Sequence, residues 1–379
     1  MFRTGGFRTS HTLLILTLAL SSLPMFSQTS PDRATGAVFV MTNDASHNQV
    51  ISFKRAADGS LADPQAFSTG GRGSGGVTDP LGSQGALTLT EDHSTLLAVN
   101  AGSGEISVFQ VHGSRITLTE KVPCGGSEPV AVAQHGSLVY VVNAGGASSV
   151  TGFWFSHGEL RHIPNSTAFL TTTNSGASSL AFTPDGQFLL VTEKLTNNID
   201  AFHVQANGTL APITVNPSAG PGLFGVAVAP NGTVLATETG PAGGQNASAL
   251  SSYLLSPSGT LTAISASTPT LGAATCWHVV TPNGQFVYTS NAGTGSISAF
   301  SVGANGALTP IAGTVVATLP GGSTNLDIAV SADGKYLYTL DSGTGTVGVF
   351  SINADGTLNV LNETGGLSEK AGFNGIAAF

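Results

Sequence analysis

Three ionisable side chains, Glu128, His278 and Asp327, stand where the other copies of a repeated strand have small or apolar residues. A carboxylate beside an imidazole suits the activation of water for ester or lactone hydrolysis, because each group can be tuned to titrate near neutral pH. We therefore predict that these three residues are catalytic. The alternative is that His278 is a core histidine and that Asp327 bonds neighbouring loop backbone.

A second set of side chains is predicted to bind the substrate. Glu193 and Lys194 replace the Asn-Ala of the "NAG" tips in other repeats, and Arg72 lies in the glycine-rich stretch "STGGRGSGG", which could lean over the same place. The alternatives are an ion pair with Glu193 or simple solvent exposure for Lys194, and a loop-ordering role for Arg72. The predicted substrate-binding residues are Arg72, Lys194, Glu193, Trp277, Asn325 and Asn374.

No spacing in the sequence matches a zinc motif or an EF-hand, and no Gly-x-Ser-x-Gly element of a serine-triad hydrolase occurs. We therefore predict a site without a cofactor. The alternative is a divalent cation such as Ca²⁺, held by Glu128, Asp327 and asparagine side chains, because Ca²⁺ prefers oxygen ligands.

A repeat of about fifty residues must position these side chains. The stretches "VYTSNAGTGSISAF" (287–300) and "LYTLDSGTGTVGVF" (337–350) each indicate a strand, a polar tip and a second strand that ends in an aromatic residue. Turn capping is the simplest role for these tips, because Asn and Asp bond nearby backbone. The polar tips recur at Asn43, Asn100, Asn143, Glu193, Glu238, Asn291 and Asp341.

Each repeat contains two further strands bounded by turns such as "TPDG", "APNG" and "ANGTL", whose Asp-Gly and Asn-Gly pairs suit the positive φ angles of tight hairpins. Four antiparallel strands in each of seven repeats predict an all-β, seven-bladed β-propeller over residues 36–379. The chain enters this domain at the second strand of a blade. We expect the C-terminal "GFNGIAAF" to supply the missing first strand and close the ring, which leaves no open edges.

The first residues are typical of a secretory signal. Arg3 and Arg8 precede an apolar run from Leu13 to Leu20 that is too short to cross a bilayer. We predict a signal peptide over 1–27, a short extension over 28–35, and a secreted or periplasmic protein. The 21 acidic and 12 basic residues argue against nucleic-acid partners and, once the signal is removed, against membrane partners. We expect a monomer that binds a small molecule, with Cys124 and Cys276 as separate buried thiols.

The repeats resemble the lactonase family of seven-bladed propellers, which includes propeller-type 6-phosphogluconolactonases and muconate-lactonizing enzymes. The resemblance covers about residues 36–379 and rests on "VYTSNAG", "VYVVNAG", "LYTLDSG" and the "PDG" and "PNG" turns. It implies an exported lactonase-like hydrolase that acts on a small lactone or ester at the mouth of the propeller channel. Because a phosphate site needs basic residues or a helix start, we predict a substrate without phosphate. The alternative is a non-catalytic propeller that binds a protein, a glycan or a small ligand.

Overall fold

The computed structural model describes residues 1–6, 36–242 and 244–379. Two units are distinguished, Met1–Arg33 and Ala34–Phe379, and the secondary structure belongs to the second unit. Residues 7–27 of the predicted signal peptide and the whole predicted extension 28–35 lie outside the described residues.

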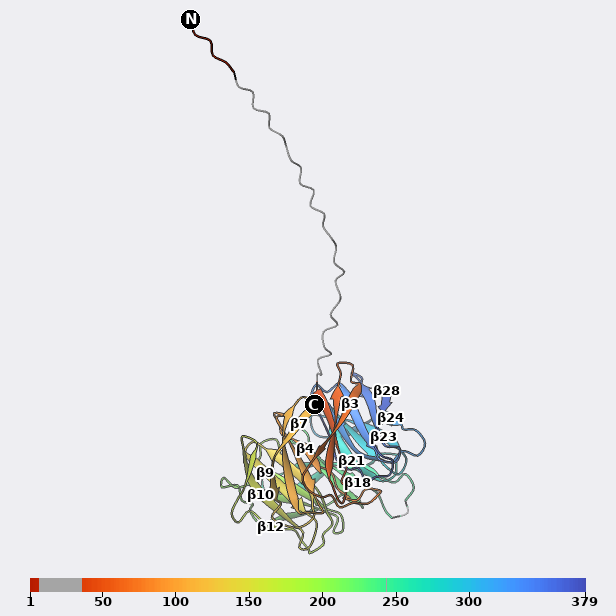
Figure 1. Cartoon of the computed structure of the whole chain (residues 1–379). Coiled ribbons are helices and arrows are strands. Elements are labelled where there is room, and N and C mark those ends of the chain that lie inside the picture. Colours follow the sequence, from red (N-terminus) through yellow and green to blue (C-terminus); the bar gives the residue numbers. More distant parts are fainter. Residues whose placement is uncertain (7–35, 243) are drawn as a thin grey trace. The chain divides into compact units, whose positions relative to one another are not determined.

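Seven antiparallel sheets form the blades of a propeller (Figure 1). The described ranges contain twenty-nine strands and no α-helix. The prediction of an all-β, seven-bladed propeller is therefore confirmed. The blades are numbered from one to seven in the order in which their second strands occur along the chain.

The strands fall into four classes by their distance from the propeller axis. The innermost strands, from blade one to blade seven, are β29 (Ile376–Ala378), β4 (Leu87–Leu89), β8 (Pro129–His135), β13 (Ala177–Phe182), β17 (Leu223–Val228), β21 (Thr275–Val280) and β25 (Asn325–Val330). The second strands are β1 (Gly36–Met41), β5 (Thr95–Asn100), β9 (Leu138–Asn143), β14 (Phe188–Glu193), β18 (Val234–Glu238), β22 (Phe286–Asn291) and β26 (Tyr336–Asp341). The third strands are β2 (Gln49–Arg55), β6 (Glu105–His112), β10 (Ser149–Ser156), β15 (Asn198–His203), β19 (Ala249–Leu255), β23 (Ser296–Val302) and β27 (Thr346–Ile352). The outer strands are β3 (Leu61–Ser68), β7 (Arg115–Pro123), β11 (Glu159–His162) with β12 (Ala168–Phe169), β16 (Thr214–Pro217), β20 (Leu261–Pro269), β24 (Leu308–Thr318) and β28 (Leu358–Thr364).

The C-terminal strand closes the ring, as predicted. β29 pairs antiparallel with β1, and Val38 lies opposite Ala378 while Val40 lies opposite Ile376. The innermost strands contact one another around the whole ring, including β25 with β29 and β29 with β4. Each blade therefore has a neighbour on both faces, which explains why second strands such as β1 and β5 are buried over their full length.

Tyrosines on the second strands of blades three, six and seven bond to a turn of the next blade. The Tyr288 hydroxyl donates to the Gly356 carbonyl at 2.9 Å, and the Tyr338 hydroxyl donates to the Gly59 carbonyl at 3.1 Å across the junction of blades seven and one. Gly59 has a φ of +86°, and a Cβ there would lie 2.3 Å from the Tyr336 ring. Only glycine satisfies both the turn and the close approach of the ring.

One face of the propeller carries both the loops that enter the innermost strands and the loops that follow the second strands, and we call it the mouth face. The two kinds of loop are joined by backbone bonds such as Lys194 N to Gly176 O at 3.0 Å. The polar tips end here as buried caps. Asn291 donates to the Ser298 hydroxyl at 2.8 Å and accepts from the Thr275 hydroxyl, so it joins neighbouring side chains. Asp341 accepts from the Gly343 backbone N–H at 3.1 Å, which is the turn cap that was predicted.

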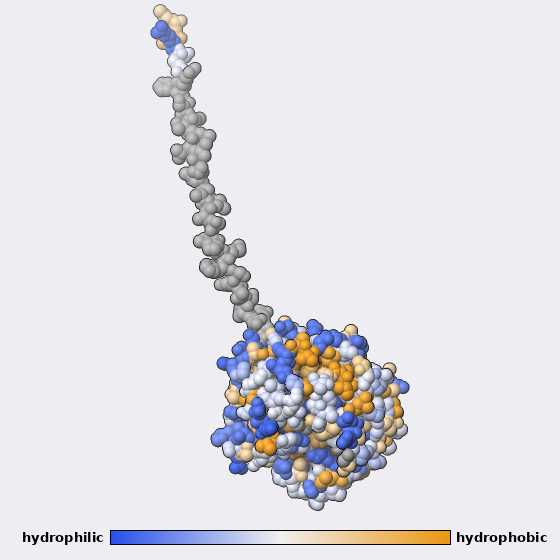
Figure 2. All heavy atoms as spheres, turned by 90° about the vertical axis from the view of Figure 1, so that its right-hand side faces the viewer, coloured by the Kyte–Doolittle hydropathy of each residue, from blue (hydrophilic) through white to orange (hydrophobic). Residues whose placement is uncertain are grey.

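The outer surface mixes polar residues with separate apolar patches on the side shown in Figure 2. No helix in the described part of the chain is long and apolar enough to cross a membrane. Both cysteines are free and buried, as predicted.

Candidate functional site

The segment that leads into β4, residues 79–85, lies across the space enclosed by the innermost strands, and we call it the cross-channel segment. The Gln84 backbone N–H donates to the Ser178 carbonyl of blade four at 2.9 Å, and its side-chain amide donates to the His278 carbonyl of blade six at 2.5 Å. The Trp277 indole N–H donates back to the Ser83 carbonyl at 2.8 Å. Because β4 belongs to blade two, these bonds bridge distant parts of the ring and fill the channel on the mouth side.

A charged cluster is built on this segment. The Lys194 ammonium donates to the Gly82 carbonyl and lies 5.1 Å from the centre of the Phe224 ring. The Asp79 carboxylate accepts from the Gly82 backbone N–H and from the Asn374 side-chain amide through Oδ1, both at 2.9 Å. Asp79 and Lys194 are half-buried. Residues of blades one, two, four and five therefore lie close together here.

Electrostatics couples the members of this cluster. Burial lowers the pKa of Lys194, and the neighbouring Asp79, Cys276 and Glu128 act against that shift. Burial raises the pKa of Asp79, and Lys194 and the bonds from Gly82 and Asn374 act against it. A cation and carboxylates that are close in space but only partly desolvated are a common arrangement at sites of chemistry. We call Asp79, Glu128, Lys194, Cys276 and Asn374 the mouth cluster.

The family model described as Lactonase, 7-bladed beta-propeller, matches residues 34–169 and 131–276. This chain belongs to the lactonase family. No curated protein matches it.

Solved structures agree with this lactonase fold. A protein of Bacteroides uniformis provisionally named 6-phosphogluconolactonase is 17% identical, with a TM-score of 0.68 over 90% of this chain and 99% of its own. A similarly named protein of Bacteroides fragilis is 16% identical, with a TM-score of 0.66 over 92% and 99%. The periplasmic gluconolactonase of Pseudomonas aeruginosa is 17% identical, with a TM-score of 0.64 over 88% and 98%. At such low identities the likeness shows the fold alone.

Among the predicted catalytic residues of this lactonase-family chain, His278 lies inside the wall of the propeller. The residue is 1% exposed, and burial lowers the pKa of its ring to about 4, against a smaller opposite effect of the Leu235 carbonyl. Neither ring nitrogen makes a hydrogen bond of good geometry with any described residue. The ring is therefore a neutral group sealed behind the cross-channel segment.

The Asp327 carboxylate accepts hydrogen bonds from backbone N–H groups where the ring closes. Its Oδ1 accepts from the Ile328 N–H at 2.9 Å, and its Oδ2 accepts from the Ile376 N–H at 3.0 Å. Burial raises the pKa of this carboxyl group to about 7. Within the described residues no hydrogen bond joins Asp327 to His278, so the structure does not form the predicted pair. The alternative stated for both residues, a core histidine and a backbone-bonding carboxylate, fits these contacts.

The predicted substrate-binding residues divide into two groups. Lys194 and Asn374 belong to the mouth cluster, with the exposed Glu128 that was predicted to be catalytic. Glu193 is buried and accepts from the Thr171 backbone and hydroxyl and from the Thr196 hydroxyl. It therefore caps a loop and forms no ion pair with Lys194.

The three remaining predicted residues make structural contacts. Trp277 is 1% exposed and packs edge-on against Phe224 with ring centres 5.1 Å apart. Asn325 is fully buried and donates to the Ser296 carbonyl at 3.2 Å. Arg72 is exposed and contacts the Gly102 carbonyl, so it lies over the loop of blade two. None of these contacts reaches the mouth cluster.

Sequence reasoning missed Asp79. The cross-channel segment has no counterpart in the other repeats, so alignment of the blades could not place it. The only signal available was the extra length of chain between β3 and β4 in the first repeat.

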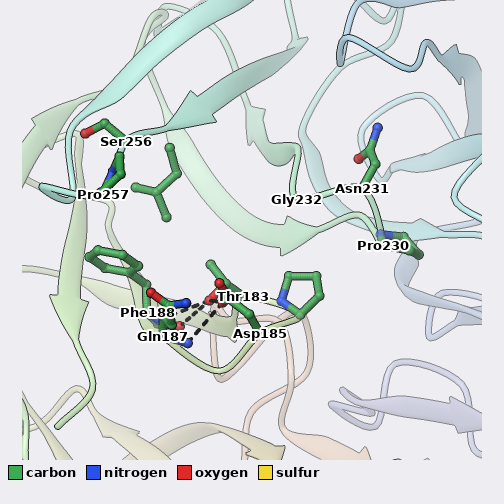
Figure 3. Close-up of a pocket in the computed structure, with 11 residues that line it drawn as sticks. Thr183, Asp185, Gln187, Phe188, Pro230, Asn231, Gly232, Ser256 and Pro257 are labelled. Carbon is green, nitrogen blue, oxygen red and sulfur yellow. Dashed lines mark hydrogen bonds between the residues drawn. The ribbon is translucent and has the colours of Figure 1, made fainter.

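A hollow of about 450 Å³ lies elsewhere, between blades four and five at the turns of the opposite face (Figure 3). Its carboxylate, Asp185, accepts from the Thr183 hydroxyl at 2.6 Å and from the Gln187 N–H at 3.0 Å. These bonds lower the pKa of Asp185 and use the group in a turn. The mouth cluster is the better candidate, because its Lys194 ammonium has hydrogen-bond donors, and its Asp79 carboxylate an acceptor, that no described residue uses.

No group of three or more His, Cys, Asp or Glu side chains is arranged to hold a metal ion in the parts of the chain that the structure describes. In the mouth cluster the charges of Asp79 and Glu128 act on Lys194. Asp327 uses both carboxylate oxygens on backbone N–H groups, so the Ca²⁺ alternative rests on Glu128 and asparagine side chains.

Proposed function

We propose that this chain is an exported hydrolase that opens a small, non-phosphorylated lactone or ester at the mouth cluster. The observation that carries the proposal is the state of Lys194. The residue is half-buried and its ammonium has three donors, and in the described structure only the Gly82 carbonyl uses one of them. The remaining N–H groups can hold the oxygen of a substrate carbonyl.

Such a donor supports ester chemistry. When water adds to a lactone carbonyl, the negative charge moves to the carbonyl oxygen, and a fixed, partly desolvated cation stabilises that charge more than it stabilises the neutral substrate. A single donor of this kind contributes about 2.7–4 kcal/mol to lowering the barrier. Phe224 is buried, and its ring centre lies 5.1 Å from the ammonium, which helps to hold the Lys194 side chain in place.

The charge of the cluster favours a substrate without phosphate. Asp79 and Glu128 both act on Lys194, so its positive charge is already balanced by carboxylates. A phosphate dianion prefers several basic groups or N–H donors in a fork, and the cluster offers one ammonium. The solved proteins named 6-phosphogluconolactonase are therefore a guide to the lactone but not to its phosphate.

Export is supported by the N-terminal sequence, in which Arg3 and Arg8 precede the apolar run from Leu13 to Leu20. The alternative function, a propeller that binds a ligand without turning it over, is favoured by one observation. The buried residues that first suggested catalysis, His278 and Asp327, make no free catalytic pair.

Hydrolysis of a lactone panel by the purified mature chain tests the proposal. The panel contains five- and six-membered lactones, including gluconolactone and its 6-phosphate, and proton release is followed at constant pH with and without a chelator. We expect turnover of at least one neutral lactone, a lower kcat/KM for the phosphorylated member of the pair, and no effect of the chelator. Binding of lactones without any proton release would support the alternative instead.

A further inference from the structure

Asp79 is the carboxylate of the mouth cluster whose geometry suits proton transfer. Its Oδ1 accepts two hydrogen bonds, from Gly82 and Asn374, which fix the orientation of the group. Its Oδ2 accepts no bond from the described residues and is not sealed from solvent, because Asp79 is only half-buried. One oxygen is therefore held while the other is free.

The backbone at Asp79 is also unusual. Its φ is +38°, in the left-handed region that few residues other than glycine adopt. The turn from Asp79 to Gly82 is kept in this conformation by the Asp79 carboxylate itself, by the Lys194 bond to the Gly82 carbonyl and by the Asn374 amide. Strained residues that their surroundings hold in place are concentrated at functional sites.

The other acids near the channel do not combine one hydrogen-bonded carboxylate oxygen with one free carboxylate oxygen. Asp327 uses both oxygens on backbone N–H groups, and Glu193 uses both oxygens on Thr171 and Thr196. Glu128 is exposed and accepts no bond from the described residues that would orient its carboxylate. His278 is sealed behind Gln84.

We propose that Asp79 is the proton acceptor of this site, with Asn374 as the residue that positions it; the inference rests on the hydrolase function proposed above. A water molecule adds its oxygen to the lactone carbonyl carbon and gives one proton to Asp79 Oδ2, while the carbonyl oxygen takes the negative charge and faces the free N–H groups of Lys194. The bond between the carbonyl carbon and the ring oxygen then breaks. The ring oxygen takes the proton back from Asp79, and the product is an open-chain hydroxy acid that loses its carboxyl proton to solvent.

The ionisation of Asp79 is set by burial, by Lys194 and by the bonds from Gly82 and Asn374. Burial raises its pKa above the ordinary value of 3.8, the positive charge of Lys194 lowers it, and Asp79 in turn acts on the buried Cys276 and Asp327. A base must be ionised to accept a proton. The rate should therefore rise with pH as Asp79 ionises, with a midpoint that burial shifts upward from the ordinary value of 3.8.

Steady-state kinetics of Asp79→Asn, Asp79→Ala and the matched control Asp63→Asn test this assignment on the lactone that the wild type turns over best. Asp63 is an exposed aspartate on β3 that shares the positive φ, at +52°. Asp79→Asn keeps an oxygen for the Gly82 and Asn374 bonds but cannot take the proton. We expect kcat to fall about 10²–10⁴-fold with KM little changed, and the acidic limb of the pH profile to disappear. Asp79→Ala should lose as much, and Asp63→Asn should match the wild type.

The outcomes separate the two proposals. If Asp79 only holds the turn, Asp79→Asn will keep its kcat and pH profile while Asp79→Ala loses activity, and the assignment of the base is wrong although the hydrolase function stands. If the wild type hydrolyses no lactone, the proposed function fails and the role of Asp79 fails with it.

Discussion

The carboxylate of Asp327 accepts a hydrogen bond from the Ile376 backbone N–H at 3.0 Å, so a side chain at the start of blade seven holds the strand that closes the ring. Its other oxygen accepts from the Ile328 N–H at 2.9 Å. The residue adopts a φ of +100°, and it lies at the register shift between Asn325 and Ile328. A position that looked catalytic by its chemistry is thus part of the closure.

Asp327→Asn is expected to destabilise the fold. The amide has one acceptor where the carboxylate uses two, so its NH₂ group would face a backbone N–H in a buried place. An unsatisfied buried group of this kind costs about 1–3 kcal/mol. Chemical denaturation should show this loss of the free energy of unfolding, with the exposed Asp63→Asn as control. An unchanged midpoint would show that the two bonds do not stabilise the closure.

Removal of residues 372–379 tests the closure more severely. The deletion takes away β29 and exposes an edge of β1, whose residues Val38 and Val40 are fully buried in the intact ring. Open edges with buried apolar residues favour aggregation. We expect the shortened chain to aggregate or to lose its cooperative melt, as measured by circular dichroism and light scattering. A melt like that of the full chain would contradict the role of β29.

The fold was predictable from sequence because the pattern of one blade recurs seven times along the chain. In addition, the two ends of the propeller domain contain complementary strands of one blade. The site was harder. Alignment gives the place of His278 and Asp327 along their strands, but bulges after Thr275 and Asn325 shift the register and change where the side chains point. Asp79 could not be found by alignment, since the cross-channel segment occurs once. Lys194 was singled out because it breaks the repeat, and Asn374 because its blade adjoins blades six and seven.

A pH effect on stability is expected from Asp200. In blade five the Ser251 hydroxyl donates to the capping Glu238 at 2.7 Å, and the register of blade four places Asp200 in the same relation to Glu193. Only a protonated Asp200 can donate as Ser251 does. Burial and then the charge of Glu193 raise the pKa of Asp200 to about 8.

The sign of the effect follows from the raised pKa. The unfolded carboxyl group ionises near pH 3.9, so the stabilisation is complete below about pH 4 and is lost as the pH rises through about 8. The pKa of Asp327 is also raised, to about 7, so its stabilisation is likewise lost as the pH rises, and the loss is complete at a lower pH than that from Asp200. Between pH 7 and 8 the wild type should lose about 1 kcal/mol to Asp200. Urea melts of Asp200→Ser should lack that part of the decline; equal slopes in both proteins would rule out a proton on Asp200.

Export predicts a processed N-terminus. Mass spectrometry of the protein from its native host should find a chain that begins within a few residues of Gln28 and lacks the apolar run from Leu13 to Leu20. Recovery of a chain that still carries residues 1–27 would refute the signal peptide.

The location of the active site is tested most directly by kcat/KM for the preferred lactone in three variants. Lys194→Met removes the free ammonium of the mouth cluster, Lys335→Met removes an exposed ammonium elsewhere, and His278→Gln changes the sealed histidine. We predict that Lys194→Met loses about 10²–10³-fold, while Lys335→Met matches the wild type and the folded fraction of His278→Gln keeps its activity. Full activity of Lys194→Met, or a loss confined to His278→Gln, would place the chemistry in the channel wall and contradict this account.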